Sequence, residues 1–198
     1  MEKEIEVKFL DIDVSDIRKK LASVGGTCQQ PMRDLRRVVI KNEATGRNSY
    51  LRVRDEGDKT TLTYKVFESL SLHGANEIET TVGDFDTAVR ILTAVGLKPE
   101  SYQESRRETW KLDGAEVVID EWPWLKPYIE IEGPSEEAVR DAAQALGFEW
   151  DGDACFGDIM VAYRAEYPSL SEKDTVGNLE FVRFDDPLPE MFIQREEQ

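Results

Sequence analysis

Glu4-Ile5-Glu6-Val7-Lys8-Phe9 alternates charged and apolar side chains without a break. Successive side chains of a β-strand point to opposite faces, so the charged side chains of this stretch share one face and the apolar ones share the other. The same acid-isoleucine-acid triplet recurs at Glu77-Ile78-Glu79 and at Glu130-Ile131-Glu132. The sequence therefore predicts three strands that each have one ionic face and one apolar face.

Each triplet precedes a segment with apolar residues at helical spacing that stops at a glycine. The segments are 15–24, 84–95 and 135–146, and the glycines are Gly25, Gly96 and Gly147. Ser15 is expected to cap the first helix, and the apolar stripes are expected to face a core. We predict a strand–helix unit used three times, with these apolar side chains beneath the helices: Ile5, Ile78 and Ile131.

Five further runs alternate in the manner of strands, and turn signals follow several of them. The runs are 35–40, 50–55, 60–67, 106–112 and 116–121, with turns at 42–46, 56–58 and 113–114. A last helical pattern covers 156–167. A total of about eight strands and four helices favours an α+β fold, in which an antiparallel sheet curls or closes and the helices pack outside it.

The chain has 198 residues and a formal net charge of −16. This acidity argues against nucleic acid or an anionic membrane as a partner, because both select cationic surfaces. No apolar run is long enough for a membrane span, the first residues are charged rather than signal-like, and Cys28 and Cys155 are interpreted as reduced thiols. We expect a soluble cytoplasmic protein with one domain over 1–167 and an acidic C-terminal extension over 168–198.

The ionic faces of the strands carry charges of both signs. Their members are Glu4, Glu6, Lys8, Arg52, Arg54, Lys65, Glu77, Glu79, Arg107, Asp120, Glu130 and Glu132. A solvated sheet face is the simplest interpretation of any one strand. Like charges at alternate positions of a strand are roughly 7 Å apart, however, and they repel unless opposite charge lies between them. If these faces line a tunnel, the carboxylates can hold Mg²⁺ or Mn²⁺ and the bases can hold phosphate groups.

The spacing Glu4-x-Glu6-x-Lys8 resembles the ExExK signature of the CYTH family, the triphosphate tunnel metalloenzymes. Further positions follow in the order that this family shows, and the resemblance covers residues 1 to about 165. They are Arg52-x-Arg54, Lys65, Glu77-x-Glu79, Arg107, Asp120 and Glu130-x-Glu132. The resemblance implies a closed eight-stranded antiparallel β-barrel around a triphosphate tunnel.

Carried over by position, the resemblance implies roles for individual side chains. The residues that would bind the triphosphate and act on it are Lys8, Arg52, Arg54, Lys65 and Arg107, with Glu77 in the same shell. The residues that would hold one or two divalent ions are Glu4, Glu6, Glu79, Asp120, Glu130 and Glu132. The family usually has Lys-x-Arg on the strand of Arg107, whereas this chain has Ser105 at the lysine position, which predicts one cation fewer in the tunnel.

The leading functional hypothesis is metal-dependent hydrolysis of a triphosphate, either inorganic tripolyphosphate or a nucleoside or thiamine triphosphate. A class IV type adenylyl cyclase, which makes cyclic AMP and pyrophosphate from ATP, is the first alternative. A non-catalytic module that binds polyphosphate or nucleotide is the second, and Ser105 is the feature that favours it. The expected partner is a small-molecule triphosphate rather than nucleic acid or membrane, and the protein is expected to be a monomer or homodimer.

Overall fold

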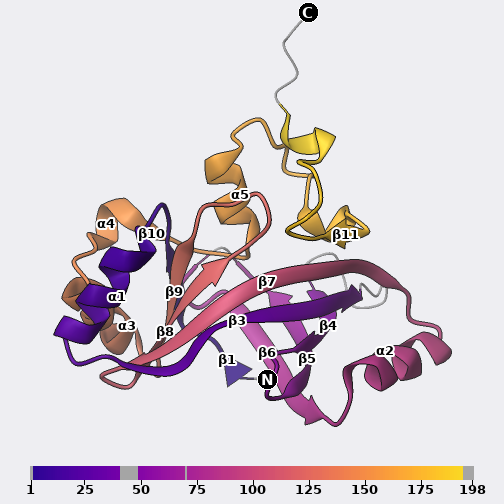
Figure 1. Cartoon of the computed structure of the whole chain (residues 1–198), viewed down its shortest axis with the longest axis horizontal. Helices are drawn as coiled ribbons and strands as arrows, with labels where there is room; N and C mark the ends of the chain where they lie inside the picture. The colour runs from indigo at the N-terminus through magenta and orange to yellow at the C-terminus, as the bar shows by residue number, and fades with distance from the viewer. Residues whose placement is uncertain (1, 41–48, 70, 194–198) are drawn as a thin grey trace, which may run out of the picture.

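The computed structural model describes residues 2–40, 49–69 and 71–193, so the turn expected at 42–46 lies outside the described residues. The helices are α1 (Val14–Ser23), α2 (Phe85–Ala94), α3 (Glu136–Ala145), α4 (Trp150–Asp153) and α5 (Met160–Glu166). The strands are β1 (Glu2–Lys3), β2 (Glu6–Phe9), β3 (Thr27–Ile40), β4 (Ser49–Asp55), β5 (Thr60–Phe67), β6 (Ala75–Val82), β7 (Pro99–Leu112), β8 (Ala115–Glu121), β9 (Tyr128–Glu132), β10 (Ala154–Cys155) and β11 (Phe181–Val182). Figure 1 shows this order along the chain.

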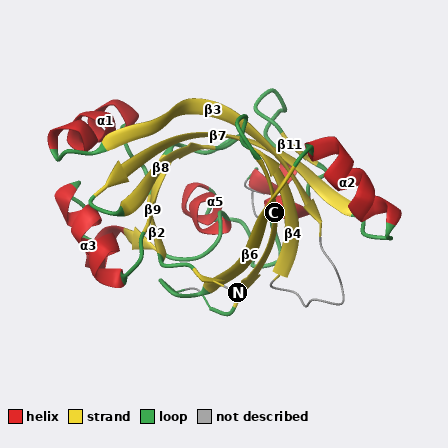
Figure 2. Ribbon diagram, turned by 90° about the horizontal axis from the view of Figure 1, so that it is seen from below, coloured by secondary structure: helices red, strands yellow, loops and turns green. Residues whose placement is uncertain are grey.

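The strands form one curled antiparallel sheet with helices outside it, as the α+β prediction requires (Figure 2). The hydrogen-bonded order is β1-β6-β5-β4-β3-β7-β8-β9-β2-β10, and β11 adds a parallel pairing with β7. The predicted closed eight-stranded barrel is wrong: within the described residues the strands form a curled half-barrel, and β1 and β10, the strands at the two ends of the hydrogen-bonded order, do not pair with each other.

The N-terminal segment explains why the ladder stays open. β1 pairs with β6 whereas β2 pairs with β9, and the chain changes partner between them. At this point the Glu4 N–H donates to the Ala75 carbonyl at 3.1 Å, and the Ile5 carbonyl accepts from the Gly133 N–H at 3.1 Å. Residues 2–9 thus pair with β6 through β1 and with β9 through β2, without forming one continuous strand.

Two strands are much longer than the sequence predicted. β3 and β7 each span 14 residues and pair with each other along most of their length. The predicted runs, 35–40 and 106–112, cover only one end of each strand. The other ends lack a clear alternation of apolar residues, because their inward positions are polar and their outward positions are partly exposed. Hydrophobic periodicity therefore stops before the strand does.

The three strand–helix units are confirmed as local structure. Each helix ends at a glycine with positive φ, namely Gly25 (88°), Gly96 (95°) and Gly147 (82°). The following residue closes the turn in each unit, as where the Gly26 N–H donates to the Leu21 carbonyl at 2.8 Å. Asp13, not Ser15, caps α1, since its carboxylate accepts from the Asp16 N–H at 2.8 Å and the helix begins one residue before Ser15.

The outer face of the sheet is covered unevenly. α1 and α3 bury Val7, Phe9 and Ile131 completely, and Ile5 packs partly buried against the same cluster. α2 packs on β4 instead of β6, the strand that leads into it. Ile78 on β6 is consequently 55% exposed, so the prediction that it lies beneath a helix is wrong.

α5 and the residues after it form a third packed cluster, whose buried members include Trp122, Met160, Tyr163 and Phe192. α5 is shorter than the predicted 156–167. Figure 2 shows it in the middle of the curl and Figure 1 shows it beyond the sheet, so α5 lies across one end of the space that the sheet encloses. None of the helices in the described part of the chain has the length and hydropathy needed to cross a lipid bilayer.

Candidate functional site

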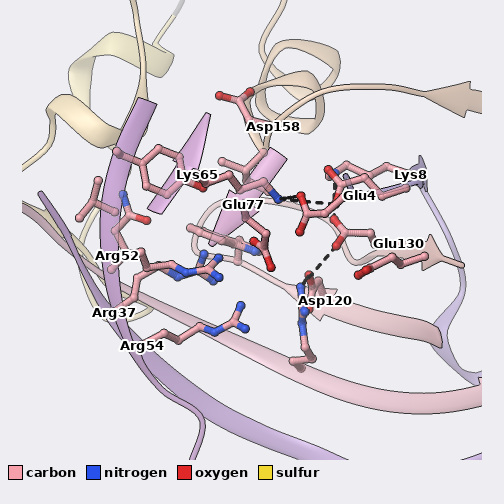
Figure 3. A pocket seen from close by; sticks show the side chains of 18 of the residues that line it. Glu4, Lys8, Arg37, Arg52, Arg54, Lys65, Glu77, Asp120, Glu130 and Asp158 are labelled. Carbon is pink, nitrogen blue, oxygen red and sulfur yellow. Dashed lines mark hydrogen bonds and ion pairs between the residues drawn. The ribbon is translucent and has the colours of Figure 1, made fainter. Parts of the chain in front are cut away.

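The concave face of the sheet encloses a cavity of about 1140 Å³. Small-molecule sites commonly measure about 300–1,000 Å³, so the space is sufficient for a nucleotide-sized ligand. Every site residue predicted from the sequence lines this cavity: Glu4, Glu6, Lys8, Arg52, Arg54, Lys65, Glu77, Glu79, Arg107, Asp120, Glu130 and Glu132. Figure 3 shows arginines on one side and Glu4, Lys8, Asp120 and Glu130 on the other.

Strand parity places these side chains. On β4, Arg52 and Arg54 line the cavity, whereas Val53 between them is fully buried in the outer core beneath α2. The sequence-based assignment of the ionic faces to the interior is therefore confirmed.

One side of the cavity is a carboxylate–lysine cluster, made of Glu4, Glu6, Lys8, Lys65, Glu130 and Glu132. Lys8 Nζ lies 2.8 Å from Glu130 Oε2 and 3.2 Å from Glu6 Oε1. Lys65 Nζ lies 2.5 Å from Glu4 Oε2 and 3.8 Å from Glu6 Oε2. Burial disfavours the Lys8 ammonium, but Glu130 and Glu6 outweigh it and raise the Lys8 pKa.

Arg107 continues this cluster toward β8. Its guanidinium donates two hydrogen bonds to the Asp120 carboxylate, at 2.7 and 2.6 Å, and lies 3.8 Å from Glu130. The Tyr128 hydroxyl also donates to Asp120, at 3.3 Å. Such a bidentate pair fixes the guanidinium plane at the border between the two sides of the cavity.

The carboxylate–lysine cluster contains more acids than its lysines neutralise. Burial raises the pKa of Glu4 and Glu6 despite the nearby lysines. Burial, together with Glu130, Glu4, Glu6 and Glu116, raises the pKa of Glu132 to about 7. A hard cation prefers carboxylate ligands of this kind, so the donor chemistry fits a divalent ion. Within residues 2–40, 49–69 and 71–193, however, no three such groups converge on one point, because Lys8 and Lys65 lie among them.

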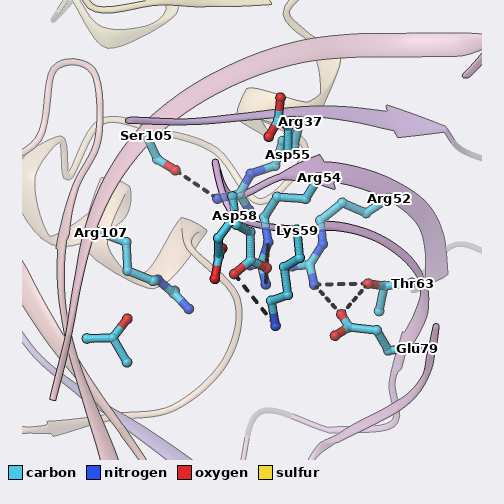
Figure 4. Close-up of polar contacts among 12 residues, drawn as sticks. Arg37, Arg52, Arg54, Asp55, Asp58, Lys59, Thr63, Glu79, Ser105 and Arg107 are labelled. Carbon is cyan, nitrogen blue, oxygen red and sulfur yellow. Dashed lines mark hydrogen bonds and ion pairs between the residues drawn. The ribbon is translucent and has the colours of Figure 1, made fainter. Parts of the chain in front are cut away.

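The opposite side is an arginine cluster, made of Arg37, Arg52 and Arg54 (Figure 4). Arg54 pairs with Glu56 at 2.5 Å, and Arg52 reaches Thr63 Oγ1 at 3.2 Å and Glu79 at 3.5 Å. Burial and repulsion between the guanidinium groups lower the pKa of Arg54 to about 10.

Sequence reasoning missed Arg37, which is only 8% exposed and lines the same cavity. Arg36 and Arg37 are adjacent in the chain, so only one of them can face inward. The outward one is Arg36, which pairs with Asp55 at 3.0 Å and lies over the Phe85 ring. Extending the alternation backward from Val38 and Ile40, which face the outer core, would have assigned Arg37 to the interior.

The comparison with family models gives one match, the CYTH domain, over residues 2–149. A conserved hypothetical protein from Pyrococcus furiosus superimposes with a TM-score of 0.67 and 22% identity, over 80% of this chain and 99% of its own. The PH1012 protein from Pyrococcus horikoshii superimposes with a TM-score of 0.68 and 22% sequence identity, over 80% of this chain and 98% of its own. A Hippeastrum protein superimposes with a TM-score of 0.57 and 16% sequence identity, over 83% of this chain and 96% of its own. That protein is named as an adenylyl cyclase with a dominant triphosphatase activity. At these identities the likeness concerns the fold. The comparison with curated sequences gave no significant match.

Proposed function

The chain belongs to the CYTH domain family, and from this premise we propose that it hydrolyses triphosphates with the help of a divalent metal ion. The observation that carries the proposal is the arginine cluster. Its three guanidinium groups are buried and face one cavity, and in the described part of the chain only two carboxylates, Glu56 and Glu79, lie within ion-pair distance of them. A polyphosphate supplies several negative charges in a row, and its oxygens match the planar donors of arginine.

The two sides of the cavity would divide the chemistry. The arginine cluster, together with Arg107 and Lys8, would hold the phosphate chain and neutralise charge that develops on its oxygens. A Mg²⁺ or Mn²⁺ ion bound by the cluster carboxylates, with Glu79 and Asp120 as further candidates, would polarise the phosphoryl group. A carboxylate of the cluster would orient water for attack on the terminal phosphorus. As the water oxygen forms its bond to phosphorus, the bridging P–O bond would break, the released inorganic or nucleoside diphosphate would take the electron pair, and the same carboxylate would accept the proton of the water.

The test is a substrate panel of tripolyphosphate, ATP, GTP and thiamine triphosphate with Mg²⁺ and with Mn²⁺. We expect phosphate release from at least one of them. Arg52→Met should lower the rate by about 10²–10³-fold, because removing one preorganised donor to a developing anion costs that much. Arg36→Met is the matched control: the same change on the outer face should leave the rate unchanged. No release from any triphosphate between pH 6 and 10 would refute the proposal.

An adenylyl cyclase remains the second candidate because the cavity exceeds what a triphosphate chain fills. Tyr50 and Phe67 line it with ring centroids 6.4 Å apart, and Lys65 lies over the Phe67 ring. Such rings can stack on a base. Incubation with ATP distinguishes the two activities, since a cyclase yields cyclic AMP and pyrophosphate whereas a hydrolase yields ADP and phosphate. Tight binding without either product would indicate the non-catalytic module.

A further inference from the structure

Arg37 differs from the other buried bases of the cavity in its partners. Its Nη2 donates to the Ser105 hydroxyl at 3.0 Å, whereas Lys8, Lys65, Arg52, Arg54 and Arg107 each lie within ion-pair distance of a carboxylate. Among the described residues no carboxylate pairs with Arg37, and its Nε has no hydrogen-bond partner. Arg52, Arg54 and Arg107 are its charged neighbours, and with burial they lower its pKa to about 9.

The surroundings nevertheless hold this guanidinium in one orientation. It lies 4.3 Å from the centre of the Trp122 ring, a geometry in which a planar cation stacks on an aromatic face. Trp122 is itself only 4% exposed and is packed against α5. The Ser105 hydroxyl fixes the edge of the group while the indole fixes its plane. Two otherwise unrelated contacts therefore direct toward the cavity a cation that has no carboxylate partner among the described residues.

A purely structural role does not account for this arrangement. A guanidinium that stabilises a protein interior is normally paired with carboxylates or carbonyl oxygens, because an unpaired buried charge is unfavourable. Arg37 has a hydroxyl and an aromatic ring instead, and its charged neighbours repel it. An anion in the cavity would supply the missing counter-charge.

Ser105 acquires a specific part in this arrangement. In the β3–β7 ladder Arg37 lies opposite Gln103 and Leu35 lies opposite Ser105, so the arginine reaches diagonally across to the serine. A lysine at position 105 would project into the space that the guanidinium occupies. The short hydroxyl leaves that space open and supplies an acceptor.

Resting on the proposed function, we propose that Arg37 binds a phosphate group of the substrate and supplies from β3 the cation that Ser105 leaves out of β7. Ser105 and Trp122 are then positioning residues that act through the Arg37 guanidinium. On this proposal the cation that the sequence predicted to be missing at Ser105 comes from the neighbouring strand β3.

The experiment is calorimetric titration of tripolyphosphate, without divalent ions, into four proteins: wild type, Arg37→Met, Ser105→Lys and the double variant. Arg37→Met should weaken binding by about tenfold to a hundredfold, as expected for lost hydrogen bonds to a charged group. Ser105→Lys alone should also bind more weakly, because its ammonium displaces and repels Arg37. The double variant should recover most of the affinity, since one cation again occupies this part of the cavity.

The readouts separate this role from a structural one and from failure of the proposed function. Loss of a structural arginine would lower the melting temperature without ligand and could not be rescued by Ser105→Lys; here the unliganded Arg37→Met protein should melt at a higher temperature than wild type. If wild type and Arg37→Met bind equally, this inference fails while the proposed function stands. If wild type binds no tripolyphosphate, this inference fails, and the proposed function is then decided by the substrate panel with Mg²⁺ and Mn²⁺. Should Arg37→Met not fold, Arg37→Gln, which keeps a donor for Ser105, replaces it with the same expected weakening.

Discussion

The two sides of the cavity carry charge in opposite ways. In the carboxylate–lysine cluster each lysine lies between glutamates, and Lys8 contacts Glu130 and Glu6 at 2.8 and 3.2 Å. In the arginine cluster the bases face one another, and Arg37 has no acidic partner among the described residues. The first side is held together by its own charges. The second contains a base, Arg37, that has no acid among the described residues, so an anion in the cavity should stabilise this side more than the first, whose lysines are already paired.

Removing a lysine from the carboxylate–lysine cluster should have the largest effect on stability. Lys8→Met leaves Glu6 and Glu130 buried without their shared counter-ion, and loss of one partner of a buried pair costs about 3–5 kcal/mol. Chemical denaturation should show this loss in the free energy of unfolding. Lys20→Met, at an exposed ion pair on α1, is the control and should change stability by less than about 1 kcal/mol. Equal stability of the Lys8→Met and wild-type proteins would contradict the comparison.

An anion bound at the arginine cluster should stabilise the protein. Tripolyphosphate at about 100 times its dissociation constant should add about 2.7 kcal/mol to the free energy of unfolding, because it binds only the folded state. Differential scanning fluorimetry without divalent ions measures the resulting rise in melting temperature. Sodium chloride at equal ionic strength controls for screening and should give a much smaller shift. A shift that chloride reproduces in full would mean that no specific anion site exists.

The destabilising charge of Arg37 should make the free energy of unfolding depend on pH. The folded-state pKa of Arg37 is lowered to about 9, so its charge destabilises the folded protein at pH 7 and does so less as the pH rises through 9. Arg37→Met should therefore be more stable than wild type at pH 7, by on the order of 1 kcal/mol. Urea denaturation at pH 7 and pH 10 should show this difference shrinking. A constant difference would contradict the assignment.

The smallest expected effect on stability concerns Glu132, in the carboxylate–lysine cluster. Glu132 has its pKa raised to about 7, so its folded-state cost is absent below pH 4.5, grows as the pH rises and is complete above pH 7. Glu132 lines the cavity but remains accessible to solvent, and this access reduces the cost to less than about 1 kcal/mol. Glu132→Gln should thus melt higher than wild type at pH 8 and equally at pH 4. A larger gain at pH 4 than at pH 8 would reverse the sign of the assignment.

Much of the site could be predicted because strand parity is a local property. In Glu4 to Lys8 and in Arg52 to Arg54, alternation with buried apolar residues determines which side chains face inward, whatever the rest of the fold does. Parity failed to place Arg37 because Arg36 beside it has the same charge. The identity of the residue does not decide which of two adjacent arginines faces the cavity; only the alternation counted back from Val38 and Ile40 does.

The errors in the fold come from contacts between distant segments. The sequence of β6 contains the alternation of a strand covered by a helix, but α2 packs on β4 and leaves Ile78 exposed. Closure of the barrel depends on whether residues 2–9 form one strand or two, and that is decided by their partners β6 and β9. Local patterns carry no information about either choice, because both are made by tertiary packing.

The double pairing of the N-terminal segment also sets an order of events during synthesis. β2 is translated well before its partner in the ladder, β9, which ends at Glu132. Strand pairs that are distant in sequence form slowly, and in a nascent chain the earlier strand stays unpaired until the later one has been synthesised. Lys8 is thus made long before Glu130, its nearest counter-ion. β2 can therefore join β9 only after more than a hundred further residues have been made, and its charged face, which later lines the cavity, stays in water until then.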